Sequence, residues 1–199
     1  KDEDDEEVTW VFDKKLATYR PSNPQRKQKE VEMCARCHSR RGVISEEYIH
    51  GKPLLDTHYP QVLEENLYYP DGQIRDEVYE YGSFLQSKMY RSGIVCTDCH
   101  DAHTTRRRKE GNELCCSCHQ AEKYGSREHH FHKMDSSGAQ CIECHMPART
   151  YMVVDPRRDH SFRVPRPDLA VKARRWDVAG IPEGVAVARA LAGKPSILL

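Results

Sequence analysis

Nine cysteines carry the clearest chemical pattern in this sequence of 199 residues. Eight of them form four C-x-x-C pairs, and a histidine follows each pair immediately. The four segments read CARCH (34–38), CTDCH (96–100), CCSCH (115–119) and CIECH (141–145). C-x-x-C-H is the attachment signature of c-type haem, because two thiols add to the two vinyl groups of the porphyrin while the histidine binds the iron.

The sequence therefore predicts four covalently attached c-type haems. The predicted thioether bonds use Cys34, Cys37, Cys96, Cys99, Cys115, Cys118, Cys141 and Cys144. The predicted proximal iron ligands are His38, His100, His119 and His145. Cys116 does not have the required spacing, and we interpret it as a small buried thiol.

Three other kinds of site use paired cysteines, and each explains the pattern less well. A disulfide framework needs no histidine after each pair, and a thioredoxin-like dithiol normally occurs once, within a βαβ unit. Two all-cysteine zinc sites are the closest alternative, since four C-x-x-C pairs supply eight thiolates. Histidine supplies 11 of the 199 residues. Its chance placement after all four pairs has a probability of roughly 10⁻⁵, so haem is favoured.

The second axial position of each iron decides whether a haem carries electrons or binds a substrate. Of the 11 histidines, four lie in the motifs and seven remain, which is enough for two histidines on every iron. Within the HHFH run (129–132), helical spacing would place the first and last histidines on one face. We predict distal ligation by His103, His129, His132 and His160. The alternatives are His50, His58 and His130.

The composition indicates a small polypeptide core. Hydrophobic residues make up 38% of the chain and aromatic residues 8%, against 31% charged residues. Because a haem is a large apolar plate, the predicted fold class is a mainly α multihaem cytochrome with much irregular structure, one short β-hairpin and a haem-filled core. The hairpin is expected within 66–81, and a helix is expected from Ser83 to a stop at Gly93. Short helices are also expected at each motif and over 182–194.

The spacing of the motifs divides the chain into three predicted parts. These are an acidic N-terminal extension (1–21), a tetrahaem domain (22–172) and a C-terminal tail with a short helix (173–199). Between motifs lie 57, then 14, then 21 residues. Fourteen residues cannot build a separate domain, so we expect the last three haems to be crowded together and the first to stand apart.

Charge and hydropathy exclude several classes of partner. Lys plus Arg equals Asp plus Glu at 31 each, so no global field attracts nucleic acid. No apolar run approaches the roughly 18 residues of a membrane span, and no transmembrane segment is predicted. The chain opens with Lys1 and acidic residues instead of a signal peptide, so we interpret it as a mature form or a fragment. Arginines within 147–167 suit either haem propionates or a solvated loop.

From about Ser22 to Lys172 the chain resembles the multihaem cytochromes related to cytochrome c-554, often described as doubled C-x-x-C-H or tetratricopeptide-linked cytochromes. These are distant relatives of the nitrite reductase and hydroxylamine oxidoreductase superfamily. The resemblance is carried by CARCHSRR, DGQIRDEVYEYGSFLQSKMY, CTDCHDAH, HHFH, CIECHMP and TYMVVDPRRDHSFRVPRPDL. It implies an exported prokaryotic protein, periplasmic or extracellular, with bis-histidine haems in closely packed pairs. It also supports His103, the HHFH run and His160 as ligand sources.

Two functions from different classes follow. The first is electron transfer to redox protein partners, with no catalytic residue, either as a soluble shuttle or as a subunit of an extracellular filament with haems stacked across copies. The alternative is a haem enzyme of nitrite or hydroxylamine chemistry with one open iron. Ammonia-forming nitrite reductases of the related superfamily commonly use a C-x-x-C-K site, and this sequence has none.

Overall fold

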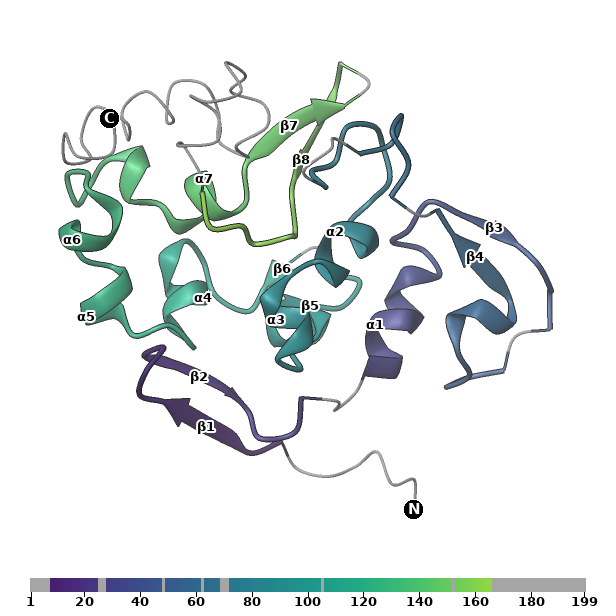
Figure 1. The fold of residues 1–199 in the computed structure, drawn as a ribbon, viewed down its shortest axis with the longest axis horizontal. Coiled ribbons are helices and arrows are strands. Elements are labelled where there is room, and N and C mark those ends of the chain that lie inside the picture. Colours follow the sequence, from purple (N-terminus) through teal and green to yellow (C-terminus); the bar gives the residue numbers. More distant parts are fainter. Residues whose placement is uncertain are drawn as a thin grey trace.

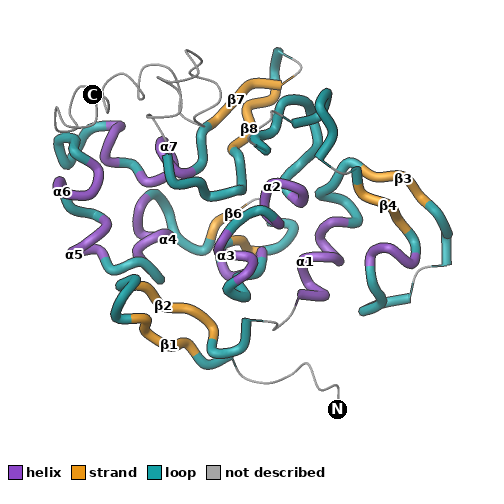
Figure 2. The backbone as a smooth tube through the Cα atoms, in the orientation of Figure 1, coloured by secondary structure: helices purple, strands orange, loops and turns teal. Residues whose placement is uncertain are grey.

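A computed structural model describes residues 8–24, 28–47, 49–61, 63–68, 72–104, 106–151 and 153–165. In this part of the chain, seven short helices and four two-stranded antiparallel hairpins are joined by long loops (Figure 2). The helices are α1 (Gln28–Ala35), α2 (Tyr81–Leu85), α3 (Lys88–Arg91), α4 (Asn112–Cys116), α5 (Ala121–Tyr124), α6 (Arg127–His130) and α7 (Cys141–His145). Three 3₁₀ helices cover Leu54–Asp56, Cys96–Asp98 and Ser137–Ala139.

Each hairpin pairs two strands that are neighbours in the sequence. The pairs are β1 (Trp10–Asp13) with β2 (Thr18–Pro21), β3 (Arg41–Val43) with β4 (His58–Pro60), β5 (His100–Asp101) with β6 (Arg106–Arg107), and β7 (Ala148–Tyr151) with β8 (Asp155–Arg158). Figure 1 shows the β1–β2 hairpin at the bottom, β3–β4 at the right and β7–β8 at the top of the view, with α1 to α4 between them and α5 and α6 at the left.

The prediction of a mainly α fold with a haem-filled core is wrong. The longest helix of the described residues has eight residues, and the rest have four or five. Their buried centre consists of two small side-chain clusters. One contains Leu67, Tyr68, Ile74, Val78 and Tyr151, and the other contains Val31, Phe84, Ile94 and Val95. A low hydrophobic content therefore reflects a small, divided protein core here, and it does not require helices.

The two elements predicted between the first and second motifs form only in part. Tyr68 and Ile74 make an isolated antiparallel bridge, and residues 69–71 lie outside the described part of the chain. The helix expected from Ser83 is split into α2 and α3. The break lies at Ser87, whose hydroxyl accepts a hydrogen bond from the backbone N–H of Tyr90 at 2.9 Å. Serine at this position starts a new helix instead of continuing the previous one.

Gly93 follows α3, as the sequence predicted, and its position requires glycine. Its φ of +85° lies in the left-handed region. An added Cβ would also lie 2.8 Å from the Cα of Pro24. The close approach brings the segment after the N-terminal hairpin against the end of α3.

The terminal predictions have different outcomes. Part of the expected N-terminal extension forms the β1–β2 hairpin, in which Asp13 accepts hydrogen bonds from the backbone N–H groups of Lys15 and Leu16 at 3.0 and 3.1 Å. Such an aspartate turn, flanked by β-formers, favours a hairpin. The helix expected over 182–194 lies outside the described residues. Every helix in the described ranges is too short or too polar to cross a membrane.

The packing of Phe84 generates a stability prediction. Phe84 is 7% exposed, and its ring contacts those of Tyr90 and Phe162 at centroid distances of 5.7 and 6.3 Å. We expect Phe84→Ala to lower the free energy of unfolding by about 3 kcal/mol, because it leaves a cavity in a small cluster. Val153→Ala is the control, since Val153 is 91% exposed. Denaturant titration measures both, and equal stabilities for the two variants would contradict the assigned core.

Candidate functional site

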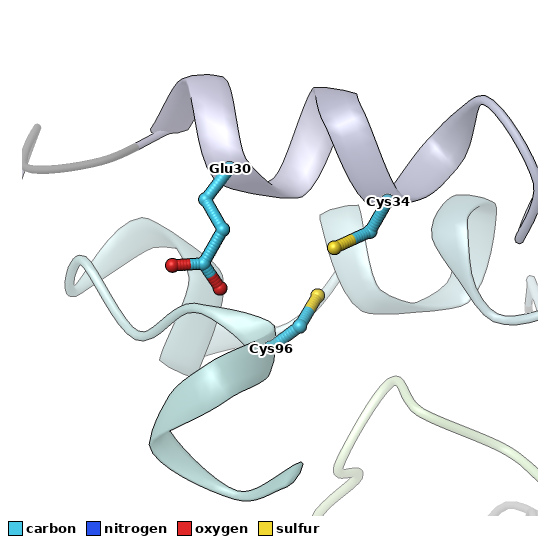
Figure 3. A group of neighbouring side chains, drawn as sticks. All are labelled: Glu30, Cys34 and Cys96. Atoms are coloured by element: carbon cyan, nitrogen blue, oxygen red, sulfur yellow. The ribbon is translucent and has the colours of Figure 1, made fainter. Parts of the chain in front are cut away.

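The first and second C-x-x-C-H motifs lie against each other. The Sγ atoms of Cys34 and Cys96 and a carboxylate oxygen of Glu30 are all within 4.8 Å of one another, and Figure 3 shows both thiols pointing into the same gap. Glu30 also accepts hydrogen bonds from the backbone N–H and the hydroxyl of Thr97, both at 2.9 Å. The thiol–thiol hydrogen bond lowers the pKa of Cys34 and raises that of Cys96.

The expectation that the first motif stands apart is therefore wrong. The 57 residues between the two motifs fold back on the first. The backbone N–H of Tyr81 donates to the carbonyl of His38 at 3.1 Å, and the N–H of Arg40 donates to the carbonyl of Val78 at 3.2 Å. The first and second motifs are therefore far apart in the sequence but close together in space.

The third and fourth motifs are joined in a similar way. Asn112, at the start of α4, donates to the carbonyl of Ala139 at 2.8 Å and accepts from the backbone N–H of Cys141 at 2.9 Å. A hydrogen bond with the Cys115 thiol lowers the pKa of Cys141 to about 7. Asn112 therefore fixes α4 relative to α7 at the first cysteine of the fourth motif.

The second and third motifs also interact. The pKa of the Cys99 thiol is raised to about 11, first by burial, then by the charge of Asp98 and by Cys118. The same Asp98 charge adds to burial in raising the pKa of Cys118. Thiols are hydrogen-bonded between the first and second motifs and between the third and fourth, and the second and third motifs share the charge of Asp98.

This arrangement does not match the zinc alternative. An all-cysteine zinc site needs four sulfur atoms at the corners of one tetrahedron. All nine cysteines lie in the described ranges, and there the one group of three or more ligands is Glu30, Cys34 and Cys96. Two sulfurs meet in that group, and both are the first cysteines of their motifs.

Two histidines outside the motifs each face a motif histidine. The rings of His100 and His160 have centroids 6.3 Å apart and planes inclined by 29°. The rings of His129 and His145 have centroids 6.0 Å apart and planes inclined by 9°. A metal bound by two opposed imidazoles requires a centroid separation of roughly 6 Å, since each bond to histidine nitrogen is about 2 Å long. Both pairs fit that requirement.

Hydrogen bonds at Nδ1 orient one ring of each pair. The Nδ1 of His145 lies 2.6 Å from the carbonyl oxygen of Arg163, and the Nδ1 of His160 lies 2.9 Å from that of Arg158. When Nδ1–H donates to a carbonyl, the neutral ring presents the lone pair of Nε2, as histidine ligands of metals usually do. Burial, followed by the nearby His160, also lowers the pKa of His100, which favours the neutral, ligating form.

The third motif receives its support from the N-terminal hairpin, which sequence reasoning missed. The hydroxyl of Thr18 lies 3.2 Å from Nδ1 of His119, and the backbone N–H of Tyr19 donates to the carbonyl of Cys118 at 2.8 Å. The N–H of Gln120 in turn donates to the carbonyl of Ala17 at 3.0 Å. Figure 1 shows the hairpin beneath α4. The β-forming residues on both sides of the Asp13 turn were the available signal.

The other two predicted distal ligands do not face a motif histidine. His103 is exposed in the turn between β5 and β6, with a φ of +63°. His132 stacks on His130 instead, at a centroid distance of 6.5 Å and an inclination of 17°. Helix α6 ends before His132, because Phe131 adopts a left-handed conformation with φ of +62°. Helical spacing therefore does not apply to the whole HHFH run.

The remaining histidines make no ring pair between a motif histidine and a histidine from elsewhere in the described chain. His50 is exposed, and His58 is half-buried with its Nδ1 2.8 Å from the hydroxyl of Thr57. Among the described residues, which include all 11 histidines, no histidine ring stacks on His38 or His119. The ring of His119 instead contacts Tyr124 edge-on, at 5.4 Å.

Two of the arginines in the C-terminal part of the domain bind carboxylates of the chain itself. Arg157 contacts Glu77, Glu80 and Asp155. Arg158 contacts Glu143 at 2.8 Å. The sequence offered haem propionates or solvent as partners for these arginines, and the structure gives Arg157 and Arg158 a third kind of partner, ion pairs within the protein.

Comparisons of the chain with protein-family models, with curated proteins and with solved structures find no match. The functional argument therefore depends on the motifs and on the geometry described above.

Arg158 links the fourth motif to the segment that carries His160, and this generates a second prediction. Its guanidinium donates to the carbonyls of Ile142 and Met146 at 3.3 and 3.0 Å and to Glu143. We expect Arg158→Ala to lower the free energy of unfolding by about 1 kcal/mol and to speed hydrogen exchange in α7, because half-buried acceptors lose a charged donor. The control is Arg107→Ala, an exposed pair with Glu110, which should change stability by less than about 0.5 kcal/mol. Unchanged exchange in α7 would contradict this role.

Proposed function

We propose that this chain carries electrons through four covalently bound c-type haems. The observation that carries the proposal is the pair of opposed histidine rings, His100 with His160 and His129 with His145. Each pair combines the histidine of a C-x-x-C-H motif with one from elsewhere, at a separation that suits two axial ligands on one iron. Ordinary ring stacking explains neither why a C-x-x-C pair precedes one ring of each pair nor why Nδ1 of His145 and His160 meets a carbonyl.

The residues have distinct roles in this proposal. The eight motif cysteines would tether the groups, and the four motif histidines would bind them. His160 and His129 would supply a second histidine to the second and fourth groups, which would leave those irons no position for a substrate. Haem iron supplies reversible one-electron oxidation and reduction when bound. The carbonyls of Arg158 and Arg163 keep the rings in position.

The order of the motifs supports transfer along the chain. Cysteines interact at the junctions between the first and second, the second and third, and the third and fourth motifs. Groups tethered through these sulfurs would have neighbouring edges at every junction. A continuous series suits an electron carrier better than isolated binding sites do.

The proposal also covers the location of the protein, its partners and its assembly. The resemblance to cytochromes related to cytochrome c-554 supports an exported location, periplasmic or extracellular, and redox proteins as partners. A homo-oligomer or filament with haems stacked across subunits is the assembly that would extend the series beyond one chain. In that arrangement a neighbouring copy would supply the second ligands of the groups bound by His38 and His119.

The covalent haem count is the first test of the function. We expect intact-mass measurement of the protein, isolated from a host that matures c-type cytochromes, to give the mass of the chain plus four haems. The pyridine haemochrome spectrum should give the same count per chain. Bound zinc with no covalent haem would overturn the proposal.

The opposed histidine pairs generate a sharper test. We expect His160→Ala and His129→Ala each to convert one haem of the four from low to high spin and to make it bind carbon monoxide after reduction. His103→Ala is the matched control and should leave all four haems as in the wild type, because His103 is exposed and faces no motif histidine. A spin change in the His103 variant alone would favour ligation by sequence spacing over the observed geometry.

A second candidate function is a haem enzyme of nitrite or hydroxylamine chemistry. The observation that favours it is that, in the described chain, no histidine ring stacks on His38 or His119. Carbon monoxide binding by the reduced wild-type protein, together with turnover of nitrite or hydroxylamine, would support the enzyme. A wild-type protein that binds no carbon monoxide would leave electron transfer as the function.

A further inference from the structure

The imidazole of His38 lies beside a carboxylate, whereas the histidines of the third and fourth motifs do not. The Nδ1 of His38 lies 3.6 Å from Oε2 of Glu80, which makes the contact an electrostatic one and not a hydrogen bond. By contrast, the Nδ1 of His145 meets a backbone carbonyl, and that of His119 meets the hydroxyl of Thr18. A full negative charge therefore faces the first motif histidine, whereas neutral oxygens face the third and fourth.

Glu80 is held in this position from the side opposite His38. Arg157 Nη1 donates to its other carboxylate oxygen at 3.1 Å. The same guanidinium bonds Glu77 through Nε at 2.8 Å and Asp155 through Nη2 at 2.9 Å. It also lies 4.8 Å from the centre of the Tyr79 ring. One cation thus serves three carboxylates, which leaves an excess of negative charge beside the first motif.

The backbone of this turn is shaped for the same contact. Tyr79 has a φ of +59°, which is uncommon for a residue with a Cβ, and its N–H donates to the side chain of Glu77 at 3.2 Å. Such strain persists only where surrounding contacts maintain it. Here the turn directs Glu77 and Glu80 to the same guanidinium.

A carboxylate beside Nδ1–H makes the imidazole a more basic ligand and favours the more highly charged, oxidised state of a metal on Nε2. We infer that Glu80, positioned by Arg157, holds the first haem at a lower reduction potential than a neutral partner would. This inference rests on the proposed function and concerns how one site is tuned.

The experiment is a redox titration of the four-haem protein. The low-spin electron paramagnetic resonance signals of the separate haems monitor the titration. We expect Glu80→Gln to raise one potential so that its oxidised-to-reduced equilibrium changes at least tenfold, which is about 59 mV for one electron. The potentials of the other three haems should move less, because the carboxylate lies beside His38. The amide oxygen introduced by Glu80→Gln can still accept a hydrogen bond from Arg157, so the fold should survive the change.

Two control variants make the result specific. Glu80→Asp keeps the charge and should return the potential toward the wild-type value. Glu77→Gln removes a carboxylate from the same arginine without removing the one beside His38, and it should shift the potentials less than Glu80→Gln does. Four unshifted potentials in the Glu80→Gln variant, or equal shifts in the Glu77 and Glu80 variants, would overturn the inference alone. A wild-type protein without covalent haem would overturn the proposed function as well.

Discussion

The direction of each imidazole ring is the constraint on which the rest of the site depends. A histidine presents one nitrogen to a metal only while an acceptor holds the other, and that acceptor sets the plane of the ring. In this chain two of the three acceptors come from other segments, and the third is local to its histidine. Thr18, in the N-terminal hairpin, serves His119, and the carbonyls of Arg158 and Arg163 serve His160 and His145. Segments near the two ends of the described chain therefore position His119 and His145, and helices of three to eight residues suffice at the motifs.

Sequence reasoning could predict the attachment motifs because their chemistry is local. Two thiols and a histidine within five residues need no knowledge of the fold. The distal histidines are different, since each reaches its partner through tertiary structure. His160 could be proposed as a ligand from the sequence, but its ring contact with His100 depends on tertiary structure. The expectation that helical spacing puts His129 and His132 on one face fails because the helix ends at Phe131, and a left-handed phenylalanine has no clear signature in the sequence.

The fold class could not be predicted for a related reason. Sparse apolar residues showed correctly that the core would be small, but they do not determine whether helices or hairpins cover it. The sequence predicted only an acidic extension over 1–21, whereas the β-forming residues around Asp13 build the hairpin that supports His119. The long sequence separation of the first two motifs wrongly predicted that they lie apart. The 57 residues between them fold back on the first motif, where the backbone N–H of Tyr81 bonds the carbonyl of His38.

If the chain carries haems as proposed, the polar groups beside the motif histidines would also set different reduction potentials, although the chain has no net charge. With 31 basic and 31 acidic residues, net charge would not order the potentials of the four proposed haems. The partners of the motif histidines are not equivalent, because a carboxylate lies beside His38, a hydroxyl beside His119 and a carbonyl beside His145. Since the basicity of an axial ligand is one of the protein's means of setting a haem potential, these contacts would separate the potentials along the series. An electron would then reside preferentially on groups with neutral acceptors, away from the Glu80 end, and the direction of transfer would be a property of the individual polar groups beside each ring.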